Sequence, residues 1–250
     1  MDKKILGVIP ARYASTRLPG KVLADICGKP MIQHVYERAL RALCLTELVV
    51  ATDDRRVFEA VRAFAGDGAA VMTSPDHPNG SSRAAEVLKS RDADAVINIQ
   101  GDEPLLDPAM IDEVAEALFS GPDVVCSTLC RPLRDEADRE NPNAVKVVLG
   151  QNGDALYFSR SPIPYLRSTP RVPVYEHIGI YGYRSGFLKR YAELPMTPLA
   201  EAESLEQLKV LEHGYRIRVA VTRCGGSGPS VDTAEDLEAV RRMLERTKNP

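Results

Sequence analysis

The sequence predicts an α/β protein with a doubly wound, mostly parallel sheet. Two observations support this class. Apolar, β-rich runs alternate with amphipathic helical stretches over residues 5–130, and several of the runs are apolar on both faces. Such strands belong to parallel sheets that are covered by helices on both sides. Ligands of these folds bind beyond the carboxyl ends of the strands, so functional side chains are expected there.

Each element of this first region follows from its local pattern. The first strand is expected over 5–11, and the first helix over 29–43, with Pro30 near its first turn. The later strands are apolar runs bounded by turn residues, and they are expected at 48–54, 69–74, 95–104 and 124–130. The helices between them show apolar residues at helical spacing, and they are expected at 55–66, 81–92 and 108–120.

The rhythm changes at about residue 145. Residues 145–164 read as a hairpin that turns at Asn152-Gly153, and 177–183 as a further strand. Helices are expected at 204–214 and 234–247. We therefore expect a single domain over 1–250, with a β-rich extension at about 125–190 that covers the site or mediates a dimer.

Composition excludes several function classes. The 250 residues are 44% hydrophobic and 27% charged, which is ordinary for a soluble globular protein. The net charge of −3 gives no overall basic field for nucleic acid. The chain has no signal-like start and no apolar run near the roughly 18 residues of a membrane span, so we expect a cytoplasmic protein and no membrane partner. The five cysteines are scattered without metal-ligand spacing, which disfavours a zinc cluster.

The loop after the first strand is unusual for its charge. The segment LGVIPARYASTRLPGK carries Arg12, Arg17 and Lys21 but no acid, in a chain that is acidic overall. Its proline, serine and glycine residues are enough to make the turn. The three cations are either solvated surface charges or the lining of a local anion site.

Two other predicted turns carry aspartates. Gln100 and Asp102 follow one strand, and Asp232 precedes the last helix. If these turns meet the cationic loop, the cations suit a polyphosphate and the aspartates suit Mg²⁺, as phosphoryl or nucleotidyl transfer requires. Two alternatives remain open: Asp102 belongs to an ordinary turn, and Asp232 merely precedes a capping box of Thr233 and Asp236. No P-loop pattern occurs, and no GxGxxG opens a helix after the first strand.

Eight segments occur in one order across nearly the whole chain: PARYASTRLPGK, ATDD, QGDEP, NPNAVKVV, ALYFSRSPIP, HIGIYGYRSGF, LEQLKVLEHG and VDTAEDLE. Together they resemble the 3-deoxy-manno-octulosonate cytidylyltransferase family, the CMP-Kdo synthetases of Gram-negative bacteria. The resemblance implies a nucleotide-diphospho-sugar transferase fold, CTP and a sugar acid as substrates, Mg²⁺ as cofactor, and usually a homodimer. The activity it implies is the making of CMP-Kdo for lipopolysaccharide.

The resemblance also implies a role for each matching residue. Nucleotide-binding residues are Ala11, Arg12, Arg17, Lys21 and Gln100. Metal-binding residues are Asp102 and Asp232, which with Arg12 and Lys21 form the catalytic set. Residues of the sugar-acid pocket are Arg83, Gln100, Ser159, Arg160, His177, Tyr181, Glu206 and Gln207.

These roles describe one reaction. The anomeric hydroxyl of the sugar acid attacks the α-phosphorus of CTP, and the loop cations neutralise the departing pyrophosphate. A hydroxyl bound to magnesium is easier to deprotonate, so no histidine base is required. His177 is then expected to donate a hydrogen bond to the substrate. The alternative is a histidine that serves only the packing of its strand.

One segment departs from the family. Where the family shows a DHxSGTER-like stretch, this chain has Asn79 for a serine, Ser81 for a threonine and Ser82 for an acid, while Arg83 is kept. The loss of the acid leaves the acceptor sugar open. The alternatives are a relative that activates 8-amino-Kdo, a sialic acid or a phosphonate, and a nonenzymatic CTP-binding regulator. A regulator, however, does not need two metal ligands.

Overall fold

The computed structural model describes residues 3–15, 18–133, 135–168, 172–225 and 228–248. The chain divides into two compact units. The first unit comprises 1–112 and 224–250, and the second comprises 113–223. The expected β-rich extension at 125–190 lies within the second unit. Its roles in covering the site and in dimerisation remain predictions.

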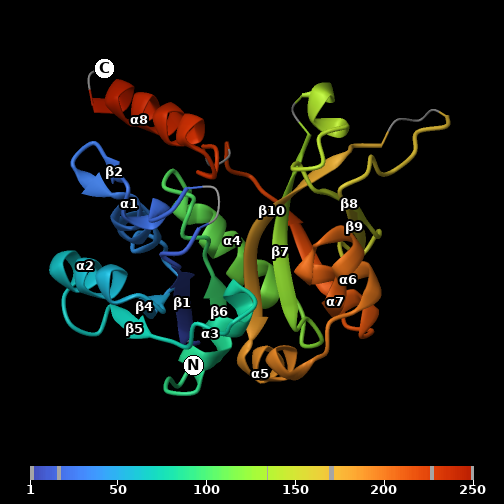
Figure 1. Ribbon diagram of the computed structural model, residues 1–250. Coiled ribbons are helices and arrows are strands. Elements are labelled where there is room, and N and C mark those ends of the chain that lie inside the picture. Colours follow the sequence, from blue (N-terminus) through green and yellow to red (C-terminus); the bar gives the residue numbers. More distant parts are fainter. Residues whose placement is uncertain (1–2, 16–17, 134, 169–171, 226–227, 249–250) are drawn as a thin grey trace. The chain divides into compact units, whose positions relative to one another are not determined.

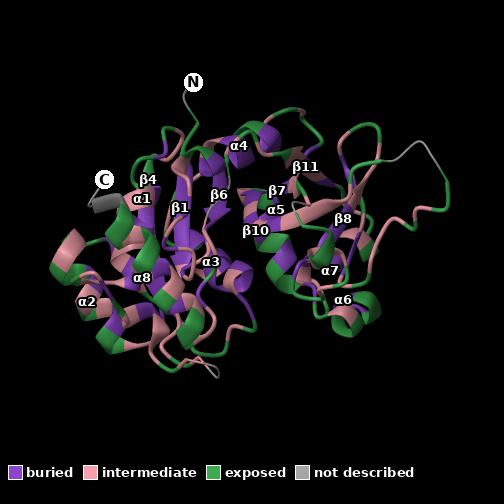
Figure 2. Cartoon of the chain, turned by 90° about the horizontal axis from the view of Figure 1, so that it is seen from above, coloured by how far each residue is buried: buried purple, intermediate pink, exposed green. Residues whose placement is uncertain are grey.

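The first unit contains four parallel strands in the order β6-β1-β4-β5 (Figure 1). They are β1 (Ile5–Pro10), β4 (Glu47–Thr52), β5 (Ala70–Met72) and β6 (Ala95–Asn98). The central strands are apolar and buried on both faces, and Figure 2 shows β1 and β6 in the colour of buried residues. Parallel strands buried on both faces need helices on both sides, and the intervening sequence supplies them.

The helices of this unit follow the strands in alternation. They are α1 (Met31–Ala39), α2 (Arg55–Ala65), α3 (Gly80–Leu88) and α8 (Ala234–Lys248), and α4 (Pro108–Leu118) crosses the boundary between the units. Helices α1 and α2 contact each other, α2 packs on β4 and β5, and α3 packs on β1 and β6. Because crossovers between parallel strands are right-handed, the return from β5 to β6 puts α3 on the face opposite to α1 and α2.

Short elements connect β1 to α1. They are the 3₁₀ helix η1 (Lys21–Leu23) and a small hairpin of β2 (Asp25–Ile26) and β3 (Lys29–Pro30). Helix α8 contacts β2, so the last element of the described chain packs beside one of the first.

The second unit is richer in antiparallel pairs. Its strands are β7 (Cys126–Pro132), β8 (Lys146–Leu149), β9 (Ala155–Ser159), β10 (Tyr175–Arg184) and β11 (Ile217–Val221). Strand β7 pairs parallel with β11 and antiparallel with β10, while β8 pairs antiparallel with β9 and β10. Its helices are η2 (Glu136–Arg139), α5 (Ser185–Glu193), α6 (Pro198–Glu203) and α7 (Glu206–Glu212).

The predicted α/β class with a mostly parallel sheet is confirmed. The expected hairpin is β8–β9, and Gly153 in its turn has φ +79°, a value that favours glycine. Pro30, expected near the first turn of this helix, is the N-cap of α1. No helix within the described ranges is both long and apolar enough to span a bilayer.

Candidate functional site

The ends of β1 and β6 bring two predicted segments together. The amide of Ile99 donates to the carbonyl of Val8 at 2.9 Å, which prolongs the parallel pairing past the end of β6. A Cβ atom on Gly101 would lie 2.7 Å from the carbonyl oxygen of Pro10, so only glycine fits there. The backbone from Gln100 to Asp102 therefore crosses directly over the end of β1.

The cationic loop returns to the same place through a tight turn. Gly20 has φ +70°, its amide donates to the carbonyl of Tyr13 at 3.0 Å, and Lys21 follows as the first residue of η1. The guanidinium of Arg56 lies 3.4 Å from the centre of the Tyr13 ring, as in a cation–π contact. Asp54 in turn binds Arg56 at 2.6 Å. Tyr13 is thus fixed on one side by Arg56 and linked on the other to the turn that presents Lys21.

Lys21 lies between the two predicted metal ligands. Its Nζ donates to Asp102 at 2.8 Å, to Asp232 at 3.0 Å and to the carbonyl of Val231 at 2.9 Å. The Val231 amide donates to the carbonyl of Asp102 at 2.8 Å, which ties the two segments together. Burial lowers the pKa of Lys21, but the two carboxylates outweigh it and the pKa is raised overall. Lys21 is therefore a firmly charged counter-ion to both aspartates.

The capping box at the start of α8 does not use the carboxylate of Asp232. The Thr233 hydroxyl accepts from the Asp236 amide at 3.2 Å, and the Asp236 carboxylate accepts from the Thr233 amide at 2.9 Å. This is the reciprocal arrangement of a capping box. The cap proposed from the sequence thus exists, and the Asp232 side chain still faces Lys21.

These groups open onto a cavity of about 340 Å³ in the first unit. Arg12 and Lys21 line it together with Gln100, Asp102 and Asp232, so five predicted residues share one cavity. Ala11 is buried and donates from its amide to the carbonyl of Ala51 at 2.9 Å. Arg17 lies outside the described residues.

The N-terminus of α3 forms another wall of this cavity. Pro78, Asn79 and Gly80 line it, and Arg12 donates to the carbonyl of His77 just before them. Unpaired amides at a helix N-terminus favour an anion, and a cationic loop beside them favours it further. The sequence pattern gave these wall residues no binding role, and the only signal for them was the helix-capping residue type at Asn79.

Asn79 and Ser82, two of the residues that depart from the family pattern, form the N-terminal cap of α3. The Asn79 carbonyl side chain accepts from the Ser82 amide at 2.8 Å, and the Asn79 amide donates back to the Ser82 hydroxyl at 3.4 Å. An acid at position 82 would occupy the same place in an ordinary capping box. Ser82 thus closes the cap of α3 together with Asn79.

Arg83 is fully buried behind this cap. Its guanidinium donates to Asp53 at 3.1 Å and to the Thr73 hydroxyl at 2.5 Å. Burial lowers its pKa, although Asp53 counteracts the effect. Arg83 does not line the cavity, and its Nη atoms are held by Thr73 and Asp53, whereas its buried Nε has no hydrogen-bond partner among the described residues. Its predicted contact with an anionic ligand remains a prediction.

In the second unit, Ser159 and Arg160 are organised by one acid at the end of α6. Glu203 accepts from the Ser159 hydroxyl at 2.6 Å and from the Arg160 amide at 2.9 Å. The Arg160 guanidinium donates to the carbonyls of Glu203, Pro142 and Ser204 at 2.7, 2.9 and 3.2 Å. Sequence reasoning missed Glu203, because its partners lie more than forty residues earlier in the chain.

His177 is a neutral imidazole in this structure. Burial lowers its pKa to about 3. The Thr128 hydroxyl lies 2.9 Å from Nε2 and 2.7 Å from the carbonyl of Ile180. Since the hydroxyl has one proton and a carbonyl only accepts, we assign the proton of the histidine to Nε2 and leave Nδ1 as an acceptor. Donation to a substrate, the role expected from the sequence, thus competes with Thr128.

Tyr181 and Glu206 lie near this histidine. The rings of His177 and Tyr181 are 5.4 Å apart, and burial together with the charge of Glu206 raises the pKa of Tyr181 well above its usual value. The tyrosine is a donor at any physiological pH. Gln207, next to Glu206 in the first turn of α7, is buried. The predicted sugar-acid residues of this unit thus come from β9, β10 and α7.

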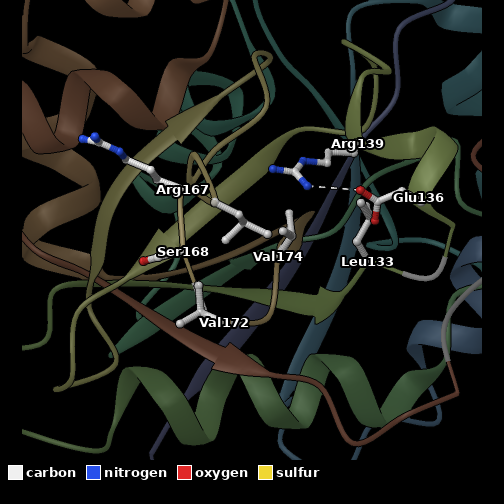
Figure 3. A pocket seen from close by; sticks show the side chains of 8 residues that line it. Leu133, Glu136, Arg139, Arg167, Ser168, Val172 and Val174 are labelled. Atoms are coloured by element: carbon white, nitrogen blue, oxygen red, sulfur yellow. Dashed lines mark hydrogen bonds and ion pairs between the residues drawn. The ribbon is translucent and has the colours of Figure 1, made fainter. Parts of the chain in front are cut away.

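A second cavity, of about 770 Å³, also lies in this unit (Figure 3). Figure 3 shows Arg139 and Glu136 joined by an ion pair beside the apolar side chains of Leu133 and Val174. None of the predicted site residues lines this cavity. Its position alone does not connect it with the chemistry above.

The comparisons with known proteins agree with this geometry. The family model described as cytidylyltransferase matches residues 6–217. A 3-deoxy-manno-octulosonate cytidylyltransferase of Solibacter usitatus is 51% identical over 247 residues, covering 98% of this chain and 96% of that protein. One of Geobacter metallireducens is 50% identical over 254 residues, covering 97% and 98%.

A solved structure is similar over the same length. It is a CMP:2-keto-3-deoxy-manno-octonic acid synthetase in complex with CTP, with a TM-score of 0.92 and 46% identity. The match covers 98% of this chain and 99% of that one.

Proposed function

The chain belongs to the cytidylyltransferase family, and from this premise we propose that it transfers the CMP moiety of CTP to the anomeric hydroxyl of 3-deoxy-manno-octulosonate (Kdo). Pyrophosphate is released, and the product is CMP-Kdo for lipopolysaccharide biosynthesis. The observation that carries the proposal is the cavity where two cations and two aspartates from distant segments meet. Relatives of about 50% identity that act on the same sugar acid span the whole chain.

The first unit handles the triphosphate. Arg12 and Lys21 line the cavity beside the N-terminus of α3, so positive charge and helix amides converge on one space. We propose that these two side chains neutralise the negative charge that develops on the departing pyrophosphate. Arg17 belongs to the same loop and is proposed to act with them.

The residues present fit a magnesium ion. The oxygens of Asp102, Asp232 and the Val231 carbonyl surround one cationic atom at 2.8–3.0 Å. No group of three or more His, Cys, Asp or Glu side chains suited to a metal occurs in the described ranges. Two carboxylates suit Mg²⁺, which keeps several waters and uses substrate phosphates rather than a closed protein cage. Asp102 and Asp232 would hold the ion, which supplies charge neutralisation at the phosphates and lowers the pKa of a bound hydroxyl.

The second unit is proposed to hold the sugar acid. Tyr181 and Gln207 offer donors, while Glu206 and the Nδ1 atom of His177 offer acceptors. Ser159, whose proton goes to Glu203, offers its oxygen as an acceptor. A polyhydroxylated substrate needs this mixture. Polar groups that a wrong substrate leaves unpaired cost about 1–3 kcal/mol each, so the site discriminates between acids.

The assembly and location of the enzyme follow as lesser proposals. We propose a homodimer, as the family resemblance implies, and light scattering of the purified chain tests it. We also propose a cytoplasmic location.

Pyrophosphate release tests the function. The purified enzyme receives CTP and Mg²⁺ with Kdo, 8-amino-Kdo, a sialic acid or no acid. Turnover with Kdo and none without an acid is the expected result. Asp102→Asn serves as the inactive control.

The outcomes separate the alternatives. Turnover of another acid with negligible turnover of Kdo would reject the acceptor while keeping the transfer chemistry. No pyrophosphate with any acid in this panel would reject the proposed Kdo activity.

A further inference from the structure

The ammonium of Lys21 is fully occupied by the two predicted metal ligands and one backbone carbonyl. An ammonium has three N–H donors, and Lys21 has three acceptors, namely Asp102, Asp232 and the carbonyl of Val231. Its side chain is only 13% exposed, while those of the aspartates are 28% and 33% exposed. Lys21 thus closes the inner side of the carboxylate pair, and the carboxylates keep contact with solvent.

This arrangement conflicts with the roles assigned above. Lys21 cannot neutralise phosphate charge while all three of its donors are engaged by Asp102, Asp232 and Val231. A divalent ion likewise cannot occupy the space between the two carboxylates while an ammonium fills it, because the two cations repel at such a distance.

We infer that Lys21 is an exchangeable counter-ion that makes divalent metal binding and CTP binding depend on each other. Without nucleotide, Lys21 neutralises the aspartate pair and opposes entry of a metal. When the triphosphate enters the adjoining cavity, Lys21 moves to the phosphates and leaves Asp102 and Asp232 to the metal. This inference rests on the proposed function, because it takes the aspartates as metal ligands and the cavity as the triphosphate site.

The chemistry of lysine suits such an exchange. Lysine carries a compact point charge on a flexible four-carbon stem, so it changes partners without movement of the backbone. Its backbone is fixed at the start of η1, behind the left-handed Gly20. The cavity that Lys21 lines is continuous with the carboxylates it binds, so the exchange needs only a rotation of its side chain.

Reciprocity gives the inference a measurable form. If CTP releases the aspartates, it raises the affinity for the metal, and the metal raises the affinity for CTP by the same factor. Removal of the Lys21 charge without nucleotide must then raise metal affinity by itself. A lysine that served only the phosphates would leave that affinity unchanged.

Mn²⁺ binding to the nucleotide-free enzyme tests this prediction. Free Mn²⁺ is measured by electron paramagnetic resonance with wild type, Lys21→Met, Lys21→Gln and the control Lys29→Met. Lys29 is also a lysine paired with an acid, Glu37, at 2.7 Å, but it does not line the cavity. We expect Lys21→Met and Lys21→Gln to bind Mn²⁺ at least about tenfold more tightly than wild type, and Lys29→Met to match wild type.

Thermal melting with and without Mn²⁺ shows whether the Lys21 variants are folded and gives a second measure of metal binding. Lys21→Met leaves two carboxylates facing each other, whereas Lys21→Gln keeps amide donors for them. Mn²⁺ is expected to raise the melting temperature of both variants more than that of wild type.

The outcomes distinguish failure of the exchange from failure of the proposed function on which it rests. Equal Mn²⁺ affinity of wild type and both Lys21 variants overturns the exchange. Where wild type with CTP still binds Mn²⁺ and Asp102→Asn with CTP does not, the metal site itself stands. If no variant binds Mn²⁺ with or without CTP, the metal proposal and the exchange fall together.

Discussion

The two units hold their buried charges in different ways. In the first, Lys21 is paired with carboxylates that keep contact with solvent. In the second, Lys146 is fully buried and donates to the carbonyls of Asn141 and Arg160 at 2.8 and 2.7 Å. Burial lowers the pKa of Lys146, whereas the carboxylates raise that of Lys21.

This difference separates a site built for exchange from one built for shape. Lys21 can exchange its two carboxylates for another anion such as a phosphate, and a metal ion can take the place of Lys21 between the carboxylates. A lysine that binds backbone carbonyls fixes the path of the chain, since each carbonyl left unpaired costs about 1–3 kcal/mol. Substitutions of Lys21 and its two acids should therefore change catalysis, whereas substitution of Lys146 should change stability.

The largest effect is expected at the aspartates. Asp102→Asn and Asp232→Asn keep the shape of the side chain but remove its charge, so turnover should fall by roughly two to three orders of magnitude. Both variants should also need more Mg²⁺. Initial rates of pyrophosphate release across an Mg²⁺ series measure both effects.

Asp236→Asn is the matched control for Asp232. It weakens the capping box with Thr233, so it should lower the melting temperature while turnover at 25 °C stays near that of wild type. If Asp232→Asn behaves in the same way, Asp232 is a structural residue and not a metal ligand.

The next effect contrasts Lys21 with Arg160. Loss of a charged contact costs about 1.5–3 kcal/mol, or roughly 10–150-fold in affinity. Lys21→Ala should raise the KM for CTP by that factor, and Arg160→Ala should raise the KM for Kdo far more than that for CTP. Steady-state kinetics with each substrate varied in turn check both. An equal rise of both KM values in Arg160→Ala would show that this arginine only holds the Glu203 segment.

The acid sensitivity of the second unit is a smaller effect. The unfolded chain protonates His177 below its usual pKa of 6.5, whereas the folded chain does so only near pH 3. The contribution of His177 to stability is therefore complete above pH 6.5 and is lost as the pH falls toward 3. By pH 5 the loss amounts to about 2 kcal/mol.

Urea unfolding of wild type and His177→Gln at pH 7.5 and pH 5 measures this contribution. The variant should lose less stability between the two pH values than wild type. The same loss in both proteins would contradict a neutral, buried His177.

The smallest effect concerns the cap of α3. Asn79→Ala should cost about 1 kcal/mol of stability, because it removes the acceptor of the Ser82 amide. Ser82→Ala should leave the ratio of Kdo to 8-amino-Kdo turnover unchanged, since its hydroxyl serves the cap. A changed ratio would make the departure from the family pattern a matter of substrate choice.

Much of the first unit was predictable from its pattern. Buried parallel strands give continuous apolar runs in the sequence. Because the carboxyl ends of such strands share one edge of the sheet, the sequence predicts that Asp102 lies close to the loop of Lys21. The same pattern offered Asp232 as a candidate at the start of the last helix, and the resemblance to the family implied that it binds metal. The sequence did not choose between Asp232 as a metal ligand and Asp232 as a residue that merely precedes a capping box, because both fit an acid at a helix start. The structure shows the capping box of Thr233 and Asp236 and also places the Asp232 carboxylate on Lys21, so the ligand role of Asp232 stays a prediction.

Other features had no local signal. Every residue type has a backbone carbonyl, so the identity of Val231 gives no signal that its carbonyl accepts a hydrogen bond from Lys21. Lys146 lies in an apolar run and was read only as part of a strand. Arg83 looked available for a ligand, because nothing near it in the chain indicates its pairing with Asp53, thirty residues away.

The hydrogen bond from Val231 to Asp102 has a consequence for how this chain folds as the ribosome makes it. The first unit is discontinuous, since residues 113–223 separate its two segments. On the ribosome, the strands around β1 emerge early, but Asp232 and α8 appear only after the whole second unit has been made. The pair that Lys21 neutralises is therefore assembled last, and a nascent chain stopped before residue 231 has Asp102 and Lys21 without the acid that completes the centre.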